Sequence, residues 1–137
     1  MAELTREVLV KAEPSTIFEL LTEPGRQSWL GTDVEFDARP GGIYKVAVSG
    51  QHPALGEFVE VVTDEKVVFT FGWSEPGHPI PSGSTKVAIT LIPEGDETRV
   101  RLVHSGLPDD AISDHEKGWQ QILDQLAAAA TSGVLNQ

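Results

Sequence analysis

The stretch that decides the fold is EKGWQQILDQLAAAA, residues 116–130, near the end of the chain. Its apolar residues recur at intervals of three and four, which places them on one face of a helix: Trp119, Ile122, Leu123, Leu126 and Ala130. A helix with so wide an apolar face has to be covered by another layer of the protein. The preceding segments must therefore supply that layer.

The start of this helix has two candidate caps. Ser113 and Glu116 have the spacing of a capping box, and Asp109 or Asp110 would instead cap an earlier start. Gly118 costs about 1 kcal/mol relative to Ala inside a helix. We expect this glycine to permit a close approach between the helix and the layer that covers it.

Most of the preceding chain predicts strands. Val34, Phe36 and Ala38 alternate with acidic residues, which is typical of a strand with one wet face. The segment KVVFTFGW, residues 66–73, is rich in β-branched and aromatic residues. The expected strands cover residues 6–12, 32–38, 43–48, 55–62, 66–73, 85–92 and 98–104. The short connections between most of them favour antiparallel pairing.

Two short helices are expected between the first strand and the second. Pro14 stands in the first turn of a helix with an apolar face that runs to Thr22. Residues 26–30 predict a second short helical turn that carries Trp29 as a packing anchor. This order of elements indicates an α+β fold in which a curved sheet of about seven strands grips the long C-terminal helix.

Composition excludes several classes of function. The 137 residues include 10 basic and 21 acidic side chains, a net charge of −11, and no cysteine. This charge argues against nucleic-acid and anionic-lipid surfaces, and the absence of cysteine excludes disulfides and thiolate chemistry. No apolar run reaches the roughly 18 to 20 residues of a membrane helix. Residues 1–7 are charged, without a signal-peptide core, so we expect one cytoplasmic domain over residues 1–137.

Several short motifs carry a family resemblance, and they lie in register over most of the chain. They are EFDARPGGIY at 35–44, GEFVEV at 56–61, TFGW at 70–73, HSGL at 104–107, His115, and Gly118-Trp119. In this order and spacing they resemble the START-like, helix-grip superfamily (SRPBCC). The nearest branch resembles the small proteins named after the C-terminal domain of the activator of the heat-shock-protein-90 ATPase.

The resemblance implies a seven-stranded antiparallel sheet wrapped around the C-terminal helix, with a cavity between them. Members of the superfamily bind lipids, polyketides, plant hormones or other apolar ligands, and a few are cyclases or hydrolases. The family name points to chaperone activation, but function depends on sites rather than on folds.

The candidate ligand-binding residues are aromatic or imidazole side chains that the pattern directs inward: Phe36, Tyr44, Phe71, Trp73, His104, His115 and Trp119. Aromatic residues of this kind line apolar pockets, although they also fill ordinary cores. The two histidines offer a polar anchor or a general acid and base, or they are hydrogen-bonded structural groups. Glu57 and Glu60 have opposite parity, so one of them faces inward unless a bulge intervenes.

No cofactor or metal is expected. The four histidines are scattered without a ligand spacing, and no phosphate-binding glycine loop or GxSxG elbow occurs. The leading hypothesis is a non-catalytic carrier, sensor or sequestering protein for a small hydrophobic or aromatic molecule. The alternatives are a cyclase or hydrolase that uses His104 or His115 with Tyr44 or Glu57, and a chaperone-regulating interaction module. A homodimer is compatible with the sequence.

Overall fold

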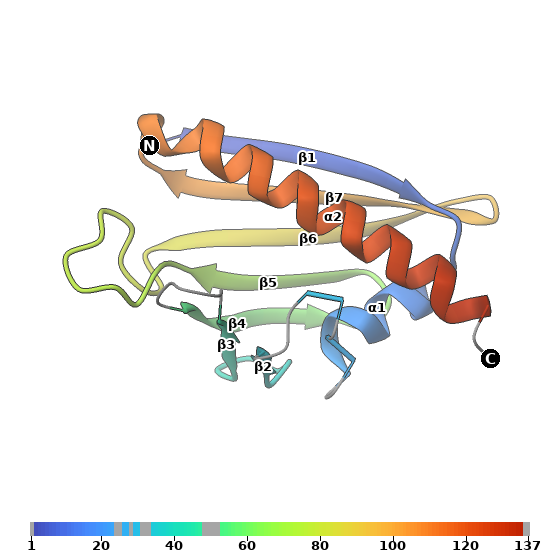
Figure 1. The fold of residues 1–137 in the computed structure, drawn as a ribbon. Helices are drawn as coiled ribbons and strands as arrows, with labels where there is room; N and C mark the ends of the chain where they lie inside the picture. The colour runs from blue at the N-terminus through green and yellow to red at the C-terminus, as the bar shows by residue number, and fades with distance from the viewer. Residues whose placement is uncertain (1, 24–25, 28, 31–33, 48–52, 136–137) are drawn as a thin grey trace.

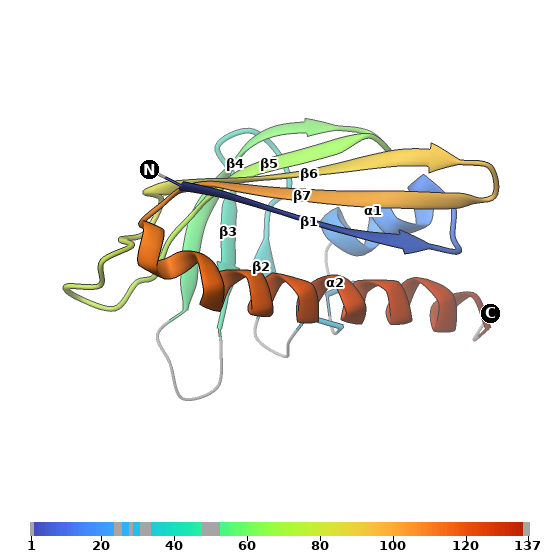
Figure 2. The same ribbon diagram turned by 90° about the horizontal axis from the view of Figure 1, so that it is seen from above.

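The computed structural model describes residues 2–23, 26–27, 29–30, 34–47 and 53–135. Seven antiparallel strands form one sheet in the order β1-β7-β6-β5-β4-β3-β2. The helix α2 (Ile112–Leu135) runs across one face of this sheet (Figure 1). Viewed from above, β2 and β3 turn toward α2, so the sheet curves around the helix (Figure 2). This is the architecture that the sequence predicts.

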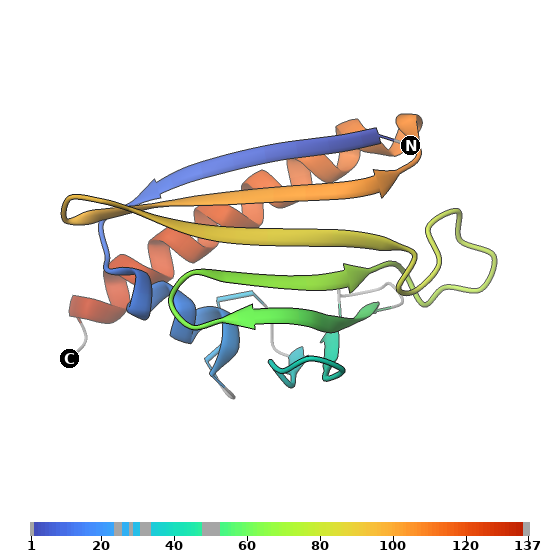
Figure 3. The ribbon, with the colours of Figure 1, turned by 180° about the vertical axis from the view of Figure 1, so that it is seen from behind.

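The strands lie close to their expected positions. Their bounds are β1 Ala2–Val10, β2 Val34–Phe36, β3 Ile43–Val46, β4 Ala54–Val62, β5 Lys66–Phe71, β6 Thr85–Glu94 and β7 Glu97–Leu107. The expected residues 32–33 and 48 lie outside the described residues. The last strand runs up to the short 3-10 helix η1 (Asp109–Ala111) that leads into α2. Figure 3 shows the opposite face of the sheet, with the two long hairpins β4–β5 and β6–β7 side by side.

The first short helix is confirmed as α1 (Pro14–Thr22), with Pro14 in its first turn. The expected second helix over residues 26–30 is not seen in the described part of that stretch. Leu30 N–H instead donates to the Gln27 carbonyl at 2.9 Å, which closes a turn, and Ser28 lies outside the described residues. Trp29 packs against the core as expected.

The start of α2 differs from both predicted caps. The helix begins at Ile112, directly from η1, so Ser113 is already helical. Pro108 precedes η1, and no side chain caps it. Gly118 is exposed, and an added Cβ would meet nothing within 4 Å. The expectation that Gly118 permits a close approach of helix to sheet is therefore wrong.

The core lies between the concave face of the sheet and α2. The inward residues of β6 and β7 alternate with half-buried or exposed ones, and Val87, Val100 and Leu102 are fully buried. From α2, four side chains of the predicted stripe are buried, Trp119, Leu123, Leu126 and Ala130, and the fifth, Ile122, is half-buried. The periods of two and 3.6 in the sequence therefore correspond to the two layers of the core.

A bulge in β4 settles which way its two glutamates point. The pairing register between β4 and β5 shifts between Phe58 and Glu60. Glu57 precedes the bulge and points outward. The extra residue in the bulge turns Glu60 outward as well, so both glutamates are exposed. Neither carboxylate reaches the interior.

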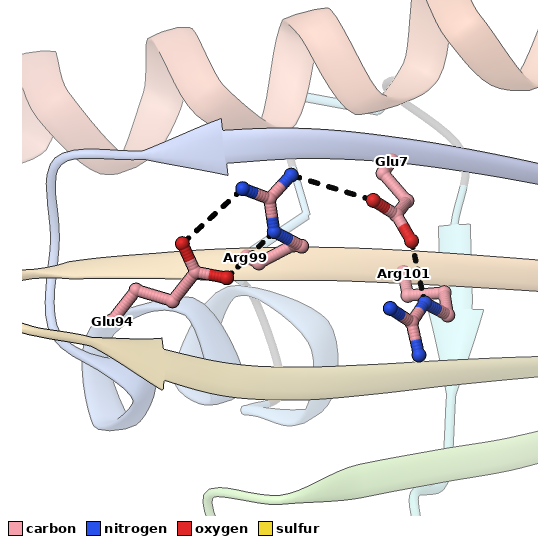
Figure 4. A network of polar contacts seen from close by, with 4 residues as sticks. All are labelled: Glu7, Glu94, Arg99 and Arg101. Atoms are coloured by element: carbon pink, nitrogen blue, oxygen red, sulfur yellow. Dashed lines mark hydrogen bonds and ion pairs between the residues drawn. The ribbon is translucent and has the colours of Figure 1, made fainter.

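The outer face of the sheet carries a charged network that joins β1 to the β6–β7 hairpin (Figure 4). Arg99 bonds Glu94 at 2.6 Å and Glu7 at 3.4 Å, and Arg101 also bonds Glu7. The bonds from these arginines hold the pKa of both glutamates below the ordinary value. Exposed pairs of this kind contribute little stability singly, but here they tie an edge strand to its neighbour.

We predict that Leu123→Ala lowers the free energy of unfolding by about 2–5 kcal/mol, the range for a truncated core leucine. Leu123 is 1% exposed and lies on the inner face of α2. Chemical unfolding of the variant and of the wild-type protein measures this loss. Asp124→Ala, on the exposed side of the helix, is the control and is expected to leave the stability nearly unchanged. An equal effect of both changes would contradict the assigned helix face.

Candidate functional site

The seven predicted site residues form one continuous aromatic and imidazole cluster under α2. Phe71 lies at its centre. Its ring centroid is 5.0 Å from that of His104, 5.5 Å from that of Trp119 and 5.7 Å from that of Trp73. His115 and Tyr44 complete the circle around Phe71 at 6.3 and 6.2 Å. Strands β2, β3, β5 and β7 and the helix α2 therefore all contribute to one cluster.

On one side of Phe71 the rings form a stack across the sheet. Phe36 of β2 lies directly opposite Tyr44 of β3. Tyr44 stacks on Phe36 with centroids 4.8 Å apart and on Phe69 of β5 with centroids 4.0 Å apart. Phe58 of β4 meets all three rings with its ring steeply inclined. Tyr44 is therefore held between two phenylalanines, with only its edge and its hydroxyl available to other groups.

A small apolar cavity lies between this stack and α2. Its volume is about 30 Å³, and one water molecule needs about 10–15 Å³ on this measure. The lining comes from both helices and from five strands: Leu21, Trp29, Leu30, Phe36, Tyr44, Phe58, Val67, Phe69, Ile89, Trp119 and Ile122. In this arrangement, the cavity has room for about two waters.

The polar groups of the cavity wall are nearly all engaged within the protein. The indole N–H of Trp29 donates to the Leu20 carbonyl at 3.1 Å, and that of Trp119 donates to His104 at 2.9 Å. Burial raises the pKa of Tyr44, so its hydroxyl stays protonated. No group among the described residues makes a hydrogen bond with this hydroxyl. Tyr44 thus offers the one unused polar group that we find in this wall.

His104 is fully buried at 0% exposure, and its two ring nitrogens are both engaged. Because an indole nitrogen can only donate, Nδ1 of His104 accepts from Trp119 and carries no proton. The proton is on Nε2, which lies 2.8 Å from the Thr85 hydroxyl. Thr85 in turn donates to the Phe71 carbonyl at 2.6 Å. The chain of bonds fixes a neutral histidine in one tautomer.

Burial lowers the pKa of His104 from 6.5 to about 3, and the nearby His115 contributes further. His104 therefore stays neutral across the physiological range. It has neither a free lone pair nor a free proton to offer a substrate in this arrangement. The sequence left two interpretations of His104 open, a polar or acid–base group of the site and a hydrogen-bonded structural group. The hydrogen bonds of His104 are those of the structural group.

His115 and Trp73 lie on the other side of Phe71, away from the cavity wall. The Trp73 indole N–H donates to His115 Nε2 at 3.5 Å, and Nδ1 of His115 lies 2.9 Å from the Ala111 carbonyl. Both side chains are half-buried. His78 precedes Pro79 in a loop, a position that predicts an exposed side chain, but it is half-buried and its Nδ1 accepts the Ile80 N–H at 2.9 Å. His52 precedes Pro53, which gives the same prediction, and lies outside the described residues.

The cavity divides the predicted residues into two groups. Phe36, Tyr44 and Trp119 line it, whereas Phe71, Trp73, His104 and His115 lie behind or beside it. The residues predicted from the sequence do not include Trp29, Leu30, Phe58, Phe69 and Ile122 in the wall or Thr85 behind it. Phe69 had the right parity in the sequence, but the segment around Trp29 has no periodic pattern that could place it.

The geometry gives little support to an acid–base site. The imidazole of His104 is occupied, Glu57 points outward, and His115 is not part of the cavity wall. Within the described ranges, no group of three or more His, Asp or Glu side chains is arranged to hold a metal ion. None of the helices in the same ranges is long and apolar enough to cross a membrane.

We predict that His104 makes the protein less stable as the pH falls. The unfolded chain binds a proton at this histidine below about pH 6.5, and the folded protein does so only near pH 3, so stability is lost between these values. The loss between pH 7 and pH 5 is about 1–2 kcal/mol. Urea unfolding at both pH values measures it. His104→Asn should be less stable at pH 7 and should lose less on acidification, whereas His78→Asn should follow the wild type. Equal pH slopes for wild type and His104→Asn would contradict the assignment.

Comparison with known proteins gives a family and a fold. The family model described as "Activator of Hsp90 ATPase homolog 1-like protein" matches residues 11–131. No curated protein matches the chain.

Several solved structures share this fold. An AHSA1-like protein from Rhizobium etli is 39% identical, with a TM-score of 0.73 over 94% of this chain and 81% of that one. A protein from Chromobacterium violaceum is 30% identical, with a TM-score of 0.78 over 93% and 96%. The Aha1 dimer from Colwellia psychrerythraea is 19% identical, with a TM-score of 0.81 over 95% and 96%, and it supports the fold alone. By the family match over most of its length, this chain belongs to the Activator of Hsp90 ATPase homolog 1-like family.

Proposed function

We propose that this protein binds a small hydrophobic or aromatic molecule between the sheet and α2, as a non-catalytic carrier, sensor or sequestering protein. The observation that supports this function is the apolar cavity beneath α2, walled by aromatic rings from the sheet and by Trp119 and Ile122 from the helix. Ligand sites are concave and mostly apolar, with few polar groups. The cavity has this composition.

The ligand has to enlarge the cavity. A volume of about 30 Å³ does not hold an aromatic ring, so binding requires side chains of the wall to move outward. Ile122 is the half-buried wall residue on α2. Displacing it opens the cavity without disturbing the fully buried Leu123 and Leu126 beside it.

The wall selects a neutral ligand with one hydrogen-bonding group. It contains no Lys, Arg, Asp or Glu side chain, and the net charge of −11 disfavours anions at long range. Tyr44 can donate or accept one hydrogen bond. A flat apolar molecule with a single oxygen or nitrogen near Tyr44 therefore fits better than a carboxylate or a phosphate.

A homodimer, a cytoplasmic location and a single domain over residues 1–137 belong to this proposal as well. Support for the dimer is that the Colwellia relative with the same fold is a dimer. A chaperone partner has weaker support, because the exposed large hydrophobic side chains among the described residues are the separate Leu9 and Val59. Light scattering of the purified protein tests the dimer.

We predict that a panel of neutral aromatic compounds quenches or shifts the tryptophan fluorescence of the protein, since Trp29 and Trp119 both line the cavity. Ile122→Phe fills the cavity and should weaken binding by about tenfold or more, the factor that corresponds to 1.4 kcal/mol. Titration of each compound and native mass spectrometry of freshly purified protein measure the binding.

The matched control is Gln121→Phe, which adds the same ring one residue away, on the exposed side of α2. It should bind as the wild type does. Equal affinity of Ile122→Phe and wild type for a bound compound would place the site elsewhere, and no binding by any compound in the panel would count against the proposed function.

A further inference from the structure

The segment from Trp73 to Ser84 projects from the end of the sheet (Figure 3). Backbone contacts of Trp73 tie it back. The Trp73 N–H donates to the Ile80 carbonyl at 2.8 Å, and Trp73 also forms isolated bridges with Ala54 and Pro81. Among the described residues, the side-chain hydrogen bond from this segment to α2 is that of the Trp73 indole with His115. Trp73 is therefore the point at which the projecting segment meets the helix.

His115 is oriented to accept this bond. Its Nδ1 lies 2.9 Å from the Ala111 carbonyl, which can only accept, so Nδ1 carries the proton. Nε2 then has a lone pair that faces the Trp73 indole N–H at 3.5 Å. An imidazolium has a proton on both nitrogens. In the protonated ring, the N–H at Nε2 would face the N–H of the Trp73 indole, so two donors would meet at this contact.

We propose that the contact between Trp73 and His115 is a pH-sensitive latch: neutral His115 holds the Trp73 indole against the start of α2, and protonated His115 releases the indole and loosens the segment 73–84, which otherwise keeps its backbone bonds to Pro53 and Leu55. Imidazole is the side chain that ordinarily changes its charge between pH 5 and 8. The bond is long, so losing it needs only a small displacement of the indole. Phe71 lies directly behind Trp73, with ring centroids 5.7 Å apart, and release of the indole uncovers it.

Other titratable groups surround the latch. His104 of β7 has its ring centroid 5.6 Å from that of His115, but it stays neutral at these pH values. His78 lies on the far side of Trp73, with centroids 6.0 Å apart. The charged groups on the elements around the contact include Glu75 of the segment, Asp109 and Asp110 of η1, Asp114, Glu116 and Lys117 of α2, and Glu3 and Arg6 of β1; Arg6 and Glu116 are ion-paired at 3.8 Å. Because His78 is a second imidazole beside Trp73, the test has to separate its effect from that of His115.

Two substitutions of His115 each keep one of its two hydrogen bonds, either the one to Trp73 or the one to the Ala111 carbonyl. Gln places an amide oxygen where Nε2 stands, so His115→Gln keeps an acceptor for Trp73 that cannot be protonated. Asn places an amide N–H where Nδ1 stands, so His115→Asn keeps the bond to the Ala111 carbonyl and loses the acceptor. Hydrogen exchange of the amides in residues 73–84, corrected for the intrinsic pH dependence, reports whether the segment is held.

In the wild-type protein we expect exchange in this segment to become about tenfold faster between pH 7.5 and 5.5, the factor expected for loss of one hydrogen bond. His115→Gln should stay slow, and His115→Asn should be fast at both pH values. His78→Asn keeps an acceptor for the Ile80 N–H and should retain the wild-type pH response. Wild-type exchange that does not change with pH, or a response that is lost in His78→Asn and kept in His115→Gln, would overturn the proposal. The readout needs no ligand, so it is independent of the proposed binding function.

Discussion

The indole of Trp119 meets the imidazole of His104 at 2.9 Å inside the contact between helix and sheet. The surrounding contact is apolar, and apolar contacts have no preferred direction. A buried hydrogen bond does have one, because an unpaired donor or acceptor at that depth is costly. This bond therefore fixes how α2 lies along β7, and with it which helical residues face the cavity. Thr85 and the Phe71 carbonyl complete the same constraint from β6 and β5.

The sequence predicted the layers of the fold because both layers are periodic. Val87, Val100 and Leu102 follow the period of a strand, and Trp119, Leu123 and Leu126 follow that of a helix. Local features that depend on tertiary contacts were not predictable in the same way. The start of α2 depends on the 3-10 turn after Pro108 rather than on a capping side chain. The outward direction of Glu60 depends on a bulge, and no residue type signals a bulge at Val59.

The sequence predicted which types of residue form the candidate site, but only part of its membership. The alternation of side chains along each strand directs Phe71, Tyr44 and His104 inward, and the structure joins them in one cluster. Parity does not say which inward residues meet across several strands. The stack of Tyr44 on Phe69 requires β3 and β5 to lie on either side of β4. The role of His104 likewise depends on Thr85 from a different strand, a partner that the sequence around His104 does not contain.

The pairing of β1 with β7 has a consequence for the order in which the protein is built. Every residue of β1 faces a partner on β7, from Ala2 opposite Leu107 to Val10 opposite Thr98. During synthesis the first strand leaves the ribosome long before β7, its neighbour in the sheet. Leu4 and Val10 are buried in the folded protein, but their side chains stay exposed to solvent until β7 has been synthesised. Contacts so distant in sequence are slow to form and leave apolar segments open to aggregation. Completion of this domain is therefore tied to completion of its translation.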